Sequence, residues 1–374
     1  MEKHSVSDFS DFIQVAKSSV PQFFCEASTT DSTELFPEKS LQFLKSSNFL
    51  TACISSELGG RNLGIEAGSN KALLTVLKWI GAGNLVLGRI LEGHFNAQIL
   101  IHQFGTPDQK RKFAEDAFDG KLFGVWNTQG NDGTFLKAEN GHFYLKGSKI
   151  FATGIGYVSR PVVTAALPDG SLQMCIVPLD EIAAKADKSW WNPLGMRATR
   201  SFKITFENAV IPAGNLLGKP GNYYEEPSFR GGSVRFSAVQ LGAAEILLKE
   251  TIHFLQTLKR TEDPLQKMRI GEMSILMESG NHWLRSAAES VDLYRNESSP
   301  ENAELYLNKA QMFRTATDEI CTKMMNLCQQ CIGARGLNTP YHFERIIRDL
   351  STYLRQPAPD HTLAEVGRFA LKRK

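Results

Sequence analysis

Three residues near the C-terminus, two cysteines and an aspartate, could take part in redox chemistry, metal binding or proton transfer. Cys328 and Cys331 form a C-x-x-C, a spacing typical of redox and metal sites. They lie inside a helical pattern and no second pair exists, so we interpret them as core thiols and predict no metal site. Asp360 could accept a proton, or it could cap the helix DHTLAEVGRF, with His361 beside it; we prefer the capping role.

Size and charge limit the classes of function. The chain has 374 residues and a net charge of +2, which allows two or three packed domains and gives no electrostatic reason to expect nucleic acid. No run of about 18 uncharged apolar residues exists, and the N-terminus has no apolar core of a secretory signal. We therefore expect no membrane span and a cytoplasmic location.

The first third of the chain reads as helices separated by loops. Residues 71–104 form a long apolar stretch, in which glycines break the helix or allow close packing. The phrase FGTPDQKRKF then begins a new helix, with Thr106 as its cap and Pro107 at its first position. We predict an N-terminal all-α domain over residues 1–118.

The apolar period changes to two in the middle of the chain. Asn140-Gly141 is a strong hairpin turn, and Pro168-Asp169-Gly170 is a second turn between strand-like runs. In SFKITF the apolar residues alternate with polar ones from Phe202 to Phe206, as a half-buried strand requires. These short strands predict a central antiparallel β-sandwich or barrel over residues 119–220.

Helical stripes return in the last third. Apolar residues step by three and four from Ile270 to Tyr294 and from Leu307 to Cys331, and further helical patterns lie over 234–258 and after Pro340. They predict a C-terminal four-helix bundle over residues 221–374. The predicted fold class is therefore α+β, with an all-α domain, a β domain and a bundle in that order.

Eight phrases follow one another in a characteristic order. They are ELGG (57–60), FGTPDQK (104–110), FGV with its polar loop (123–128), LKGSKIFATG (145–154), LGMRAT (194–199), FENAVIPAGNLLG (206–218), QCIGARG (330–336) and ERIIRD (344–349). In this order the chain resembles the acyl-CoA dehydrogenase superfamily from about residue 43 to 368. Its C-terminal half is similar to the branch with a divergent C-terminal domain, which includes flavin-dependent monooxygenases. The resemblance implies a FAD-dependent oxidoreductase.

The resemblance implies that two segments hold the flavin ring. They are Trp126-Asn127-Thr128 and Phe151-Ala152-Thr153. An aromatic plane would cover the ring, while hydroxyl and backbone N–H groups would bond to N5 and O4. The other interpretation of Trp126 and Phe151 is that they are ordinary core aromatics. The usual serine of the family's loop is missing from Gly130-Asn131-Asp132-Gly133.

The resemblance also implies contacts to the adenine and diphosphate end of FAD. They would come from Gln330, Gly333, Ala334 and Gly336, in a segment that reaches a FAD held mainly by a neighbouring subunit. A homodimer or homotetramer is therefore expected. The alternative is a glycine-rich helix end. Arg260 lies near a family arginine that touches the diphosphate, or it is an exposed surface residue.

The base used by the family's dehydrogenases has no counterpart here. A dehydrogenase removes an α-proton with a carboxylate, but the two matching positions hold Pro357 and Val234, which cannot accept a proton. No catalytic residue is assigned, and Asp360 is the remaining candidate. We interpret one further group as a surface ion network: Arg345, Arg348 and Asp349.

Three functions remain open from the sequence. The first is an acyl-CoA dehydrogenase-like FAD-dependent oxidoreductase that does not use the standard α,β-dehydrogenation and acts on a small molecule, such as an acyl thioester. The second is a flavin-dependent monooxygenase, because reduced flavin can react with oxygen without α-proton abstraction. The third is a degenerate, flavin-free protein that binds a ligand or serves in assembly.

Overall fold

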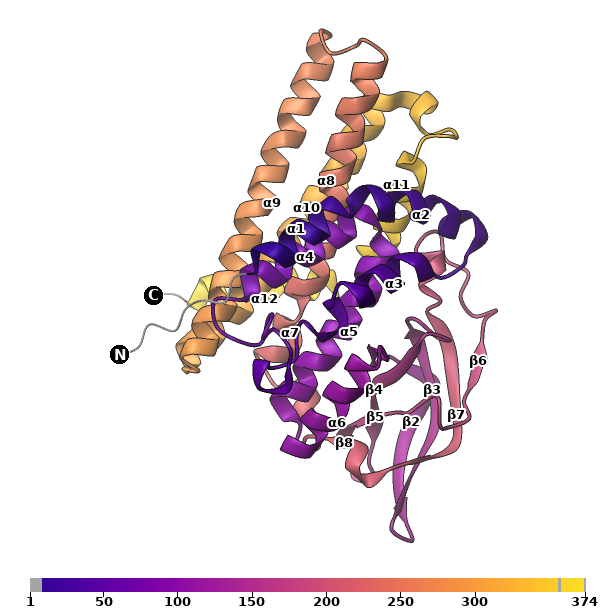
Figure 1. Ribbon diagram of the computed structural model, residues 1–374. Helices are drawn as coiled ribbons and strands as arrows, with labels where there is room; N and C mark the ends of the chain where they lie inside the picture. The colour runs from indigo at the N-terminus through magenta and orange to yellow at the C-terminus, as the bar shows by residue number, and fades with distance from the viewer. Residues whose placement is uncertain (1–8, 356–357, 373–374) are drawn as a thin grey trace.

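The computed structural model describes residues 9–355 and 358–372 and has three parts in chain order. Figure 1 shows the long C-terminal helices at the top, the sheet at the lower right and the N-terminal helices between them. The predicted α+β order of helices, sheet and helices is confirmed. Among the described helices, none combines the length and the apolarity that a membrane span needs.

Six α-helices lie within residues 9–118. They are α1 Ser10–Ser18, α2 Val20–Thr33, α3 Glu38–Ser46, α4 Asn70–Gly83, α5 Leu85–Phe104 and α6 Pro107–Phe118. The predicted start of α6 is confirmed: the Thr106 hydroxyl accepts the Gln109 backbone N–H at 3.2 Å, and the Gln109 side chain accepts the Thr106 N–H at 2.9 Å.

The central part is one sheet of eight strands. They are β1 Leu122–Trp126, β2 Gln129–Glu139, β3 His142–Ala152, β4 Val158–Ala166, β5 Leu172–Ile176, β6 Lys185–Asp187, β7 Phe202–Ile211 and β8 Leu216–Leu217. The hairpin at Asn140-Gly141 is confirmed, and both residues have positive φ, as its tight turn requires. Most pairs are antiparallel, as predicted, but β1 and β2 each pair with β4 in parallel.

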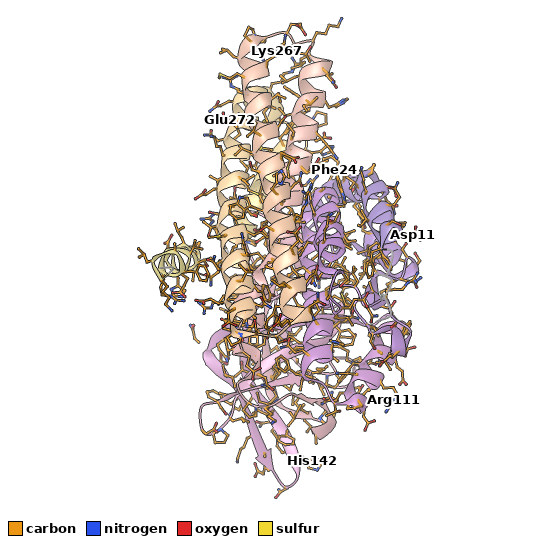
Figure 2. The ribbon with its side chains drawn as sticks, turned by 90° about the vertical axis from the view of Figure 1, so that its left-hand side faces the viewer. Asp11, Phe24, Arg111, His142, Lys267 and Glu272 are labelled. Carbon is orange, nitrogen blue, oxygen red and sulfur yellow. The ribbon has the colours of Figure 1, made fainter. Side chains whose placement is uncertain are left out.

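The described C-terminal part contains three long helices, α8 to α10, and three shorter ones. They are α7 Ser228–Gly231, α8 Ser233–Thr257, α9 Pro264–Asn296, α10 Pro300–Gly336, α11 Phe343–Tyr353 and α12 Pro359–Lys372. The predicted stripes are buried along α9 and α10, where they face the neighbouring helices. Cys328 and Cys331 are both buried in α10, as predicted for core thiols. Figure 2 shows α12 end-on, at the side of the long helices.

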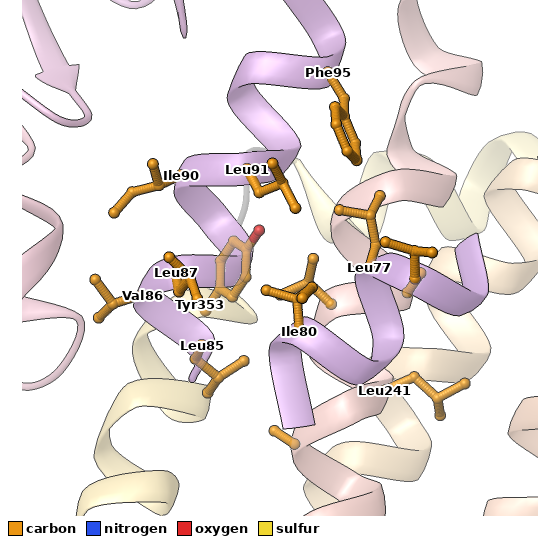
Figure 3. Packing of buried hydrophobic residues seen from close by; sticks show 14 of the residues in the cluster. Leu77, Ile80, Leu85, Val86, Leu87, Ile90, Leu91, Phe95, Leu241 and Tyr353 are labelled. Carbon is orange, nitrogen blue, oxygen red and sulfur yellow. The ribbon is translucent and has the colours of Figure 1, made fainter. Parts of the chain in front are cut away.

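Helices α4 and α8 lie so close together that their contact accepts only glycine. A Cβ added to Gly242 would lie 2.0 Å from the Lys78 carbonyl oxygen, and one added to Gly81 would lie 2.2 Å from the Val239 carbonyl oxygen. Around this contact the core continues through Leu77, Ile80 and Leu241 into α5 (Figure 3). The N-terminal part and the bundle therefore share one core.

We expect Gly242→Ala to lower the free energy of unfolding by about 1–3 kcal/mol or more, because the added methyl group must push two backbones apart. Gly271→Ala is the matched control: Gly271 lies in exposed α9 with open space around it, so alanine should raise stability by about 0.5–1 kcal/mol. Urea unfolding measures both values. Equal changes for the two variants would contradict the close contact.

Two of the three residues expected in a surface ion network, Arg345 and Asp349, are buried, and the third, Arg348, is partly exposed. Arg345 and Asp349 are 4% and 3% exposed, and Arg348 pairs with Asp31 at 2.6 Å and with Glu344 at 2.7 Å. The Asp349 carboxylate accepts the backbone N–H of Met196 at 2.5 Å, and burial raises the pKa of Asp349 to about 6. This network joins α11 to the loop that precedes β7.

Candidate functional site

A cavity of ≈ 1240 Å³ lies where the three parts of the chain meet. Its walls come from the ends of β1 and β3, the loop before β7, one face of α5, and the ends of α8 to α12. Lining residues on α5 extend from Arg89 to Gln103, 14 positions, or about 21 Å along the helix. The cavity is therefore long enough for a flat ring system together with a second small molecule.

Three hydroxyl groups form a chain on the β side of the cavity. The Thr153 and Ser201 oxygens are 2.9 Å apart, and those of Ser201 and Thr199 are 2.8 Å apart. The Thr199 hydroxyl donates to the Met196 carbonyl at 2.8 Å. Because each hydroxyl has one proton, Ser201 donates to Thr199 and Thr153 donates to Ser201. The Thr153 oxygen is thus left as an acceptor for an N–H group in the cavity.

An aromatic face adjoins the hydroxyl chain. Phe151 is half exposed, has a positive φ of 55°, and lies where β3 has one residue more than β7 in their pairing. Its ring meets Trp190 and Trp191 edge-on, with centroids 4.9 Å and 6.0 Å away. An exposed aromatic residue with a strained backbone is typical of a binding site. Phe151 and Trp191 both line the cavity.

Asn127 lines the cavity and is held from three directions. Its side-chain oxygen accepts the Thr164 hydroxyl at 2.7 Å and the Tyr224 hydroxyl at 3.1 Å. Its backbone carbonyl accepts the Lys149 ammonium at 2.8 Å. Lys149 is fully buried, and burial lowers its pKa to about 7. These bonds fix the loop after β1, including Thr128, which also lines the cavity.

The helical wall has a polar stripe on α5. Arg89 forms an ion pair with Glu92 at 2.5 Å, and the Asn96 amide donates to the other Glu92 oxygen. The Asn96 oxygen in turn accepts the Arg235 guanidinium of α8. Burial opposes the charge on Arg89, but Glu92 raises the pKa of Arg89 above its ordinary value. The stripe is a continuous hydrogen-bonded line across the cavity.

The structure brings four of the predicted residues together in this cavity. They are Asn127, Thr128, Phe151 and Thr153. Trp126 is 1% exposed and does not line the cavity, so the expectation of an indole in the cleft is wrong. Its indole N–H donates to the Thr153 carbonyl at 3.0 Å, so Trp126 supports the backbone of Thr153 from behind.

The predicted contacts to the adenine end lie away from the cavity. Gln330 is 16 residues, or about 24 Å, beyond Arg314, a lining residue of the same helix. The four residues lie at the end of α10: Gln330, Gly333, Ala334 and Gly336. Arg260 lies at the same end of the bundle, which Lys267 marks in Figure 2, and pairs with Asp263 at 3.2 Å. A role for these residues toward a neighbouring subunit stays a prediction.

The carboxylates that line the cavity do not include Asp360, the predicted candidate for the base. Asp360 is exposed in the first turn of α12 and does not line the cavity, and the helix begins before it at Pro359, so it is not the cap. Val234 is buried, and Pro357 lies outside the described residues. Of the described lining residues, Glu66 and Glu92 carry carboxylates. Glu92 is committed to its pair with Arg89.

One pattern in the sequence predicts part of the helical wall of the cavity. Arg89, Glu92 and Asn96 step by three and four within the apolar stretch 71–104, and a polar stripe there indicates a functional face. Ser201 and Thr199 offer no such pattern, because a loop brings them to Thr153. No group of three or more metal-ligating side chains occurs within residues 9–355 and 358–372.

Comparisons with known proteins agree with this architecture. Residues 234–355 match the family model "Acyl-CoA dehydrogenase, C-terminal domain". A dibenzothiophene monooxygenase of Mycolicibacterium goodii is 24% identical over 364 residues, covering 88% of this chain and 86% of that protein. Isobutyryl-CoA dehydrogenase of Dictyostelium discoideum is 23% identical, covering 86% and 79%. FMN-bound TdsC of Paenibacillus sp. A11-2 superposes with a TM-score of 0.88 at 21% identity, covering 97% and 98%.

Proposed function

Because the chain belongs to the acyl-CoA dehydrogenase superfamily, we propose that its cavity binds a flavin and that the protein is a flavin-dependent monooxygenase of a small molecule. The chain is an enzyme of the oxidoreductase kind. The observation that carries the proposal is the cavity itself, where an aromatic face and a hydroxyl chain meet and the buried carboxylate is already paired.

The residues on the β side fit a flavin ring. Phe151 offers an exposed aromatic edge, and Thr153 offers an oxygen acceptor that suits the N5–H of a reduced flavin. Asn127 and Thr128 supply further polar groups on a loop that Lys149 holds in place. A bound flavin would supply the redox chemistry, while these side chains orient the ring and limit the access of water.

The carboxylates favour oxygenation over α,β-dehydrogenation. Dehydrogenation needs a free carboxylate facing the substrate α-carbon. Glu92 accepts bonds from Arg89 and Asn96, and Glu66 accepts the Asn62 amide at 2.9 Å. The relatives include a dibenzothiophene monooxygenase, and TdsC is described as a monooxygenase of the same kind.

An anaerobic titration separates the two reactions. We expect no bleaching of the flavin absorbance when a saturated acyl-CoA is added, and we expect oxygen use when a flavin reductase and NAD(P)H reduce the flavin in air. Bleaching by the acyl-CoA would contradict the oxygenase assignment. A protein that takes up neither FAD nor FMN would support the flavin-free alternative.

We propose FAD as the form of the flavin, held in a homodimer or homotetramer in which the end of α10 reaches the neighbouring subunit. The supporting observation is that Gln330, Gly333 and Ala334 are exposed there, and Gly333 interrupts the helix with a φ of 58°. The opposing observation is the FMN in TdsC. Competition between FAD and FMN for the purified protein decides between them.

Phe151→Ala should weaken flavin binding about 10-fold, because the loss of an aromatic contact of roughly 1 kcal/mol or more is joined by the loss of its apolar area. Fluorescence quenching of added flavin gives the dissociation constant. Phe135→Ala is the matched control, since Phe135 is equally exposed on β2 and does not line the cavity. Equal flavin affinity in both variants would show that Phe151 does not touch the ring.

A further inference from the structure

Two arginines line the cavity without a carboxylate partner. The Arg295 guanidinium donates to the Ile65 carbonyl at 3.1 Å, and its Nε has no acceptor although it is shielded from solvent. Arg235 donates through Nε to Asn96. Arg89, Arg230 and Arg355, which also line the cavity, each pair with a carboxylate. In the described part of the chain, no such pair within 4.0 Å forms at Arg235 or Arg295.

Two acids near this wall, Asp292 and Glu66, accept hydrogen bonds from asparagines. Asp292 lies one turn before Arg295 on α9, but its carboxylate accepts the Asn70 backbone N–H at 3.3 Å and the Asn70 amide at 2.6 Å. Glu66 lines the same wall and accepts the Asn62 amide at 2.9 Å. Neither carboxylate forms an ion pair within 4.0 Å of the two guanidinium groups, although the charge of Asp292 raises the pKa of Arg295.

The two arginines act on each other and on the same neighbours. Burial is the main cause that lowers the pKa of Arg295, and the positive charge of Arg235 lowers it further, while Tyr306 and Asp292 raise it. Both arginines also lower the pKa of Tyr306, which burial raises and which lines the cavity beside them. Two like charges in a partly buried site repel each other, so a bound anion between them would be stabilising.

We propose that Arg235 and Arg295 bind an anionic group of the substrate, a carboxylate or a phosphate. A planar guanidinium presents paired N–H donors that match these oxyanions. Apolar side chains line the same cavity, among them Ile99, Leu100 and Phe236. The substrate class is therefore a small organic acid or phosphate ester with an apolar body. The inference rests on the proposed function, because it names the substrate of the same cavity.

A flavin phosphate is the other source of the same chemistry. The four predicted flavin contacts that line the cavity lie at the ends of β1 and β3, whereas the arginines lie on α8 and α9, on the helical wall. This separation favours the substrate. The flavin phosphate then becomes an outcome that the experiment must distinguish.

The test measures two affinities in the flavin-loaded protein. Inorganic phosphate and benzoate are the anionic probes, and their dissociation constants follow from the rise in unfolding temperature with probe concentration. We expect Arg235→Met and Arg295→Met each to weaken the binding of at least one probe about 10- to 100-fold while the flavin affinity changes less than about 2-fold. Arg295→Lys should retain part of the affinity. Arg285→Met, on the exposed face of α9, is the control and should change neither value.

Three results would overturn the proposal. They are a wild-type protein that binds neither probe, variants that bind the probes as tightly as wild type, and variants in which flavin affinity falls while probe binding stays. The last result would assign the arginines to the flavin phosphate. A protein that takes up no flavin but loses phosphate binding in both variants would keep the anion site and overturn the proposed function instead. Circular dichroism checks that each variant is folded.

Discussion

Arg89→Leu should lower the free energy of unfolding by about 3–5 kcal/mol at pH 7, because it leaves a buried carboxylate without its cation. Glu92 is 1% exposed and pairs with Arg89 at 2.5 Å. After the substitution only the Asn96 amide remains as a partner. The deficit should shrink toward pH 5, since an unpaired buried carboxyl group is more easily protonated. Urea unfolding at both pH values measures the effect.

The double variant Arg89→Leu/Glu92→Leu is the control for this prediction. It removes both charges, so it should recover most of the stability lost by the single variant. A single variant that loses less than about 1 kcal/mol would mean that water in the cavity solvates Glu92. In that case Glu92 would be free to act as a base, which would favour α,β-dehydrogenation.

Lys149→Met should stabilise the protein at pH 7 by up to the order of 4 kcal/mol, an advantage that disappears by about pH 10. Burial lowers the pKa of Lys149 to about 7 in the folded protein, whereas an unfolded lysine titrates near 10.4. Between these values the unfolded chain binds more protons, so the stability of the wild type rises with pH. Methionine fills about the same space without a charge, so the stability of the variant does not rise with pH in this way.

The measurement is the difference between variant and wild-type unfolding free energies from pH 7 to pH 10, in which other titrating groups cancel. Lys146→Met is the matched control, because Lys146 is exposed on the same strand. Its curve should run parallel to that of the wild type. At pH 10 the Lys149 variant should fall below the wild type by about 1–2 kcal/mol, because the bonds to Asn127 and Thr164 are gone. Parallel curves for both variants would mean that Lys149 is charged in the folded protein at pH 9.

Short-range patterns predicted the elements of the fold well. The turn at Asn140-Gly141 and the cap at Thr106 depend on a few neighbouring residues, and both lie where the sequence indicates. The alternation from Phe202 to Phe206 is likewise local, and the three apolar residues are buried. Such features are determined by backbone conformation and period, which the sequence expresses directly.

Contacts between distant segments were beyond those patterns. Trp126 was expected in the cleft, but β1 pairs with β4 in parallel, and the indole packs into the core behind Thr153. Arg345 and Asp349 were expected on the surface, but α11 lies against the Met196 loop and buries them. Arg235 and Arg295 reach one cavity from two helices. No residue spacing in the sequence predicts these contacts between distant segments.

The contact between Gly81 and Gly242 has a consequence for how molecules enter and leave. The two backbones leave no room for even one methyl group, so we expect α4 and α8 to move as one unit. Movement that admits a substrate is then expected at α12, which faces the cavity through His361 and Thr362 and is tied to α7 by the Arg230–Glu365 ion pair. In this arrangement α12 would move to open the cavity, while the α4–α8 contact keeps its geometry.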